Sequence, residues 1–260
     1  MRNRRKFELS SIDMTTFLII SLLGVRLLTL PRDLAGHTKL GAWVSVLIGT
    51  ATIFILSFMM YWLGIKHPEK NGSEIVLSLY GKFLGPLGIL LISINTLGAA
   101  GLGMRLFEDT IKMYLLPQTP SMVIAMVMLG VAFYTFNLGL KVITSLINIL
   151  IPPVLLSIIF IMLLPLSRVD AENFMNPFGL GILPVFEGSL EVLDALYGFT
   201  LITYLMPYFK ERESVKRWVT VGISIPSIIY FNVVLLCILV FGDAEMGRML
   251  YPTVTLAKSI

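Results

Sequence analysis

Charged residues are scarce in this chain: Asp, Glu, Lys and Arg make up only 14% of its 260 residues. Hydrophobic residues make up 56%, and the mean hydropathy is +0.86. These values exclude a soluble domain and a disordered chain, and they predict an all-α protein that crosses a membrane several times.

Cysteine and histidine are almost absent. Cys237 has no possible disulfide partner in the chain, and His37 and His67 lie too far apart in the sequence to suggest a zinc site. The sequence also has no phosphate-binding glycine loop and no nucleophile–base arrangement. We therefore expect neither an enzyme nor a bound cofactor.

The net charge of +4 does not indicate nucleic-acid binding, because the basic residues form short clusters between apolar runs. Such clusters are typical of loops that stay on the cytoplasmic side of a membrane. Counted by side, Lys and Arg favour a cytoplasmic amino terminus in a multi-pass protein of the lipid bilayer. The basic start lacks a cleavage site, so we interpret it as a tail before the first span.

The apolar runs predict seven complete spans in one transmembrane domain, 1–260. Their expected positions are near 13–30, 41–64, 86–115, 120–136, 142–164, 184–206 and 218–241. A polar turn is expected at 31–40, and a short helix on the membrane surface near 73–81. Residues 242–260 read as the approach to an eighth span that is cut short.

The first span is interrupted. Gly24 and Arg26 lie within an apolar run that is otherwise long enough to cross a bilayer. Non-helical backbone survives in a membrane only where it is buried in protein or lines a wet cavity. We therefore expect a binding site at Gly24, Val25, Arg26 and Leu27.

The sixth span has a similar interruption, at Tyr197, Gly198, Phe199 and Thr200. Paired broken helices in transporters with inverted repeats expose backbone groups to a small solute. Their free ends suit a carboxylate and an ammonium group, which favours an amino acid. Glycine is also a common packing residue in membrane helices, so the pattern alone leaves both interpretations open.

Three carboxylates, Glu187, Glu191 and Asp194, share one helix face at the start of span 6. Glu191 and Asp194 are candidate charge partners of Arg26, although Arg26 is also close enough to Pro31 to extend its side chain outward. In span 3, Asn95 and Gly98 belong to a small and polar face where a solute or another helix could approach.

Several segments resemble the B subunits of spore germinant receptors, the spore germination permeases of the amino acid–polyamine–organocation transporter superfamily. They are LTLPRDLA, GAWVSVLIG, IKMYLLPQTP, YGFTLITYLMPYFKE and FGDAEMGRMLYPTVTLAKSI. The resemblance implies a LeuT-like helical bundle of ten spans. It also implies a nutrient-binding role beside germinant receptor A and C subunits, in the spore inner membrane.

Two positions depart from this family's pattern: Arg26 stands where relatives often have glycine, and Thr200 where they often have an acidic residue. Both departures speak against a simple neutral amino acid as the ligand and leave room for an acidic or differently charged germinant. Three hypotheses follow: a receptor subunit that binds a small nutrient, an amino acid permease, or a truncated scaffold that binds nothing. Neighbouring genes for A and C subunits would favour the receptor, and uptake of a labelled amino acid into vesicles would favour the permease. Deletion without loss of nutrient germination would favour the scaffold.

Overall fold

The computed structural model describes residues 8–38, 41–170, 181–209 and 214–258. All the regular elements within these ranges are helical, which confirms the all-α class predicted from the sequence. Five helices are long and apolar enough to cross a membrane, and there are up to seven spans if each of two bent helix pairs is one span. The chain is therefore a multi-pass membrane protein.

The long helices occur in the order expected from the apolar runs. They are α1 (Ser11–Leu22), α2 (Arg26–Thr38), α3 (Ala42–Lys66), α4 (Gly72–Tyr114), α5 (Ser121–Leu138), α6 (Leu140–Leu163), α7 (Leu183–Ala195) and α9 (Val215–Met246). Shorter helices are η3 (Leu164–Arg168), η5 (Tyr197–Thr200), α8 (Leu201–Leu205), η6 (Met206–Tyr208) and α10 (Pro252–Lys258).

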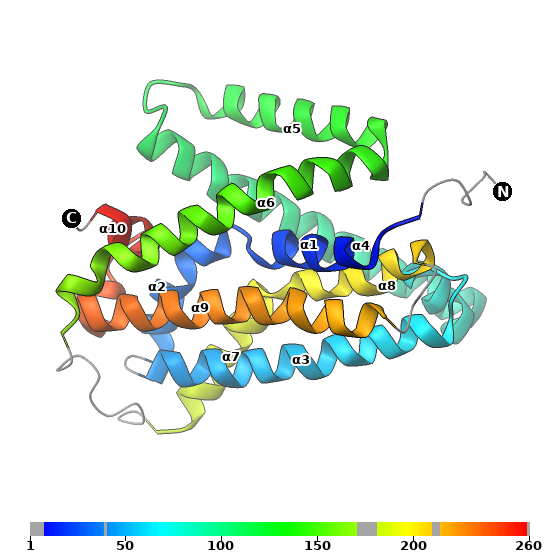
Figure 1. Ribbon diagram of the computed structural model, residues 1–260, viewed down its shortest axis with the longest axis horizontal. Helices are drawn as coiled ribbons and strands as arrows, with labels where there is room; N and C mark the ends of the chain where they lie inside the picture. The colour runs from blue at the N-terminus through cyan, green and yellow to red at the C-terminus, as the bar shows by residue number, and fades with distance from the viewer. Residues whose placement is uncertain (1–7, 39–40, 171–180, 210–213, 259–260) are drawn as a thin grey trace.

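The two bent pairs, α1–α2 and α7–α8, pack with α3 and α9 into the body of the protein (Figure 1). Leu18, Ile223 and Tyr230 are fully buried in the core between these helices. Hydroxyl groups also join the helices to one another. The Thr15 hydroxyl donates to the Trp218 carbonyl at 2.8 Å, and the Ser45 hydroxyl donates to the Val185 carbonyl at 2.8 Å.

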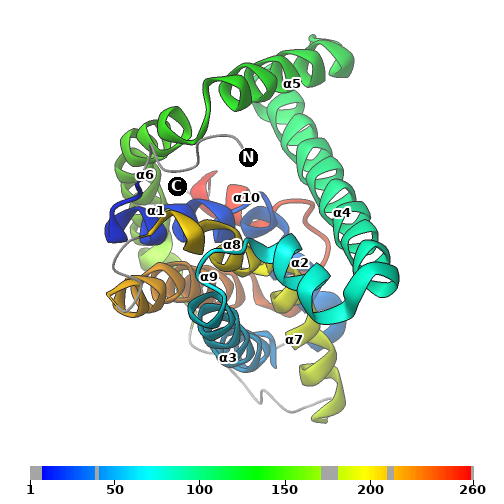
Figure 2. The same cartoon turned by 90° about the vertical axis from the view of Figure 1, so that its right-hand side faces the viewer.

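Helices α4 and α5 lie mostly outside this body, whereas α6 packs against α1 and α9. Figure 2 shows α4 standing away from the other helices and connecting them to α5 at the edge of the molecule. Large apolar side chains such as Phe83 and Phe133 project from α4 and α5 with exposed fractions of 94% and 72%. Such side chains are compatible with lipid contact, where an exposed apolar surface carries no penalty.

Three segments of the chain differ in secondary structure from what the sequence predicted. The turn expected at 31–40 is wrong for its first part, because α2 continues through Pro31 to Thr38. Residues 72–80 are helical as expected, but they form the first part of α4 and not a separate helix, with Gly81 as a break at φ +71°. The polar segment at 165–183 begins with η3, and its residues 171–180 lie outside the described part of the chain.

Candidate functional site

Span 1 is broken where the sequence predicted. Helix α1 ends with the Leu23 amide donating to the Ile19 carbonyl at 2.8 Å, and α2 starts with the Leu27 amide donating to the Gly24 carbonyl at 3.1 Å. The two halves are bent by 52°. A helix end leaves carbonyls at one side of the break and amides at the other without their usual partners.

Span 6 is broken in the same way. Helix α7 ends at Ala195, and the chain continues as the tighter helix η5 before α8, with a bend of 54°. Gly198 lies within η5, together with Tyr197, Phe199 and Thr200. Both predicted breaks are therefore present.

The two breaks touch each other. The Ser21 hydroxyl, in the last turn of α1, lies 3.4 Å from the Gly198 carbonyl oxygen that accepts its hydrogen bond. A Cβ atom at Gly198 would lie 2.6 Å from the Ser21 carbonyl oxygen, which is closer than any real Cβ contact. Glycine at this position is what allows the two broken spans to meet.

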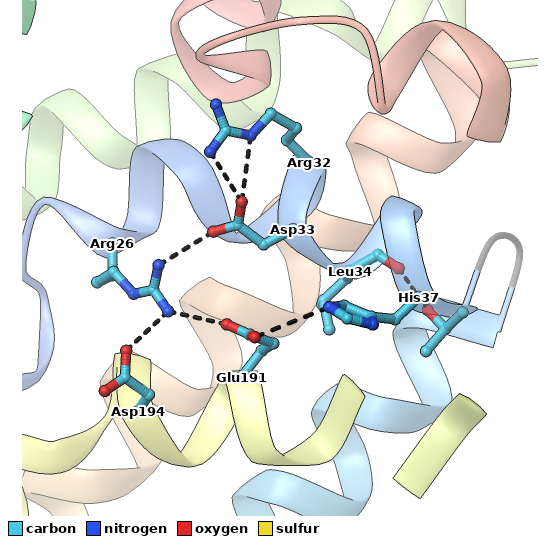
Figure 3. Close-up of polar contacts among 8 residues, drawn as sticks. Arg26, Arg32, Asp33, Leu34, His37, Glu191 and Asp194 are labelled. Carbon is cyan, nitrogen blue, oxygen red and sulfur yellow. Dashed lines mark hydrogen bonds and ion pairs between the residues drawn. The ribbon is translucent and has the colours of Figure 1, made fainter. Parts of the chain in front are cut away.

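Arg26 forms ion pairs that join α2 to α7 (Figure 3). Its Nη2 lies 2.9 Å from Glu191 Oε2 and 2.7 Å from Asp194 Oδ2. Its Nη1 lies 3.0 Å from Asp33 Oδ2, on the second turn of its own helix. The guanidinium therefore sits between three carboxylates just beyond the break in span 1.

Further groups extend this cluster along α2. Arg32 pairs with the other oxygen of Asp33 at 2.9 Å, and His37 Nε2 lies 3.8 Å from Glu191 Oε1. Two arginines thus face three carboxylates, so the cluster carries one net negative charge while His37 is neutral. Among the residues that the structure describes, no group of three or more His, Cys, Asp or Glu side chains is placed to hold a metal ion.

Sequence reasoning missed Asp33, Arg32 and His37. Asp33 lies seven residues after Arg26, which is two helical turns and therefore the same helix face. This spacing was readable in the sequence, but it has meaning only if the helix continues through Pro31.

A cavity of about 960 Å³ opens on the other side of the span 6 break, between α3, α4 and α8. Three predicted site residues line it, namely Tyr197, Phe199 and Thr200, and so do Ser93 and Thr96 of α4. Its wall is largely apolar, with a few hydroxyl groups. This combination suits a small amphipathic ligand.

The other predicted site residues do not line this cavity. Asn95 and Gly98 are exposed on α4, and an added Cβ at Gly98 would meet no atom within 4 Å. Leu27 is buried in the core, whereas Gly24 is exposed at the break and Val25 is half-buried. The structure thus brings the two breaks and the Arg26 cluster together, and it leaves Asn95 and Gly98 apart from them.

Comparison with known proteins gives consistent results. A family described as "Spore germination protein" matches residues 8–260. Spore germination protein B2 of Bacillus subtilis (strain 168) is 30% identical over 271 residues, which cover 98% of this chain and 70% of the relative. Spore germination protein YndE of the same organism is 23% identical over 97% of this chain and 70% of the relative. Spore germination protein A2, also from this organism, is 22% identical over 92% of this chain and 66% of the relative.

Proposed function

The chain belongs to the spore germination protein family, and from this we propose that it is the nutrient-binding membrane subunit of a germinant receptor. In this proposal it does no catalysis. It binds a small nutrient between the broken halves of spans 1 and 6, and binding starts germination. The contact between Ser21 and Gly198 is the observation that carries the proposal.

Two touching breaks support solute binding for a physical reason. The carboxyl end of α1 carries the negative end of a helix dipole, which favours a positive group, and the amino end of α2 carries the positive end, which favours a negative group. A zwitterion such as an amino acid satisfies both at once, and broken helices serve this purpose in transporters. A plain membrane anchor gains nothing from breaks at matching depth.

The charge of the Arg26 cluster refines the class of nutrient. Arg26 is already paired with three carboxylates, so it offers no unpaired cation to an acidic nutrient. Asp194 is the most exposed of the three, with 66% of its side chain open. We infer that a zwitterionic or cationic amino acid, with its ammonium group near Asp194, fits better than an acidic one.

We further propose that the protein lies in the spore inner membrane with its amino terminus in the cytoplasm, and that receptor A and C subunits are its partners. A LeuT-like arrangement, in which spans 1 and 6 move relative to their neighbours, would then transmit binding. A ligand shifts such an equilibrium only by its difference in affinity for the two states. The breaks provide the residues that change neighbours between those states.

Substitution of Gly198 tests the proposal directly. Gly198→Leu would place a side chain against the Ser21 backbone and force the breaks apart. We expect the amino acid-triggered germination response to be abolished, while protein levels in the spore membrane stay normal. Gly130→Leu on α5 is the matched control, because a Cβ there meets no atom within 4 Å. A normal response in the Gly198 variant would rule out this site.

The same breaks suit an amino acid permease, which is the second candidate function. Uptake of a labelled amino acid into vesicles that contain the protein, with loss of uptake in the Gly198→Leu variant, would favour transport over signalling. Binding without uptake would favour the receptor.

A further inference from the structure

Helix α2 contains a proline in its interior. In a regular helix the amide of residue 31 would donate to the carbonyl of Leu27, but Pro31 has no N–H. Leu27 and Pro31 are both buried, so water does not replace the missing donor. A buried carbonyl without a partner is costly in a membrane protein.

A side chain from the far end of the chain supplies the missing donor. The Thr253 hydroxyl, on α10, donates to the Leu27 carbonyl at 2.8 Å, and Thr253 is itself buried. Helix α10 also packs against α9. The proline position is thus a junction of three helices.

The other half of span 1 is held in a comparable way. Had α1 continued without a break, the Leu22 carbonyl would receive the amide of Arg26. The Tyr230 hydroxyl, on α9, donates to this carbonyl instead at 3.1 Å, and Tyr230 is fully buried. Each half of the broken span therefore has one backbone carbonyl that is satisfied by a hydroxyl from another helix.

We propose that Tyr230 and Thr253 are positioning residues that set the angle between the halves of span 1, and that Thr253 couples α10 to the half that carries Arg26. This inference rests on the proposed function, since the angle matters because the break holds the nutrient. Movement of α2 on nutrient binding is then transmitted to α10, which lies at the end of the described chain.

A double-mutant cycle tests the coupling without any nutrient. Thr253→Val removes the donor but keeps the shape of the side chain, and Pro31→Ala restores a backbone amide for the Leu27 carbonyl. In the 260-residue chain in lipid nanodiscs, we expect Thr253→Val to speed hydrogen exchange at the α10 amides roughly tenfold, the size expected for one lost buried hydrogen bond. In the Pro31→Ala background the same substitution should have no further effect.

Thr255→Val is the matched control, because the Thr255 hydroxyl donates locally, at 3.2 Å, to the carbonyl of Tyr251, the residue just before α10. Equal exchange in the Thr253 and Thr255 variants, or an equal effect of Thr253→Val in both backgrounds, would overturn the coupling. A Tyr230→Phe variant that leaves exchange at the amides of residues 19–23 unchanged would overturn the role of Tyr230.

Germination of spores that carry these variants tests the link to nutrient binding. We expect Thr253→Val and Tyr230→Phe each to raise the amino acid concentration for half-maximal response by roughly tenfold. In a Pro31→Ala background, Thr253→Val should raise this concentration no further, whereas Tyr230→Phe should still raise it. If the exchange results hold while every variant responds normally to nutrient, the helix junction stands and the proposed function fails.

Discussion

At Arg26, three carboxylates share one guanidinium, and water reaches them to different degrees. The exposed fractions of the side chains are 16% for Asp33, 33% for Glu191 and 66% for Asp194. Because solvent screens the exposed pair, we expect Asp194→Asn to lower the free energy of unfolding by less than about 1 kcal/mol. Arg26→Gln leaves three acids facing one another, and we expect a loss of about 3 kcal/mol. Thermal unfolding of the purified protein in detergent measures both.

Arg105→Gln is a suitable control, since Arg105 is 62% exposed and forms only pairs within α4. The loss from Arg26→Gln should shrink in a Glu191→Gln background, where one repulsive acid is gone. A loss of the same size in both backgrounds would contradict a shared cluster. An Arg26→Glu, Asp194→Arg exchange should restore stability only in part, because the new acid at position 26 would face Asp33 and Glu191.

Among the helices, α4 shows how one glycine shapes an element. Gly81 has a φ of +71°, while an added Cβ there would meet no atom within 4 Å. Backbone conformation alone should therefore decide the cost of substitution. We expect Gly81→Val to lower the melting temperature of the purified protein, at a cost of about 1–3 kcal/mol. Gly101→Val, also in open space but within regular helix, should change it little. Equal melting temperatures would mean that the break at Gly81 is not required.

The elements also show what the sequence could and could not predict. Gly24 and Gly198 marked both breaks, because a glycine in the middle of an apolar run is a local signal. Pro31 was misleading, since proline usually ends a helix. Here the helix continues because Thr253 satisfies the carbonyl that Pro31 leaves without a donor. That hydrogen bond comes from a residue distant in the sequence, so the local pattern around Pro31 could not predict it.

Over the whole molecule, hydropathy locates the spans but does not distinguish core helices from outer ones. The most apolar windows of α5 and α9 have mean hydropathies of 1.8 and 2.4, yet 6% of the first and 56% of the second is buried in the protein. Lipid and protein interior are both apolar, so a lipid-facing helix needs no polar face. For the same reason, no pattern in the amino-acid sequence indicates that Asn95 and Gly98 lie on an exposed helix rather than at the breaks.

The orientation of the whole molecule is the remaining prediction. With a cytoplasmic amino terminus, the loop at 67–71 lies inside and the loop at 115–120 lies outside, because an odd number of spans separates them. Cys237 is the single cysteine and is buried, so a Cys237→Ser background gives a chain without reactive thiols. In sealed cells that express this chain, a membrane-impermeant maleimide should label Gln118→Cys at once and Lys70→Cys only after permeabilisation. The reverse pattern would place the amino terminus outside, and the Arg26 cluster, which lies in the second half of span 1, would then face the cytoplasm.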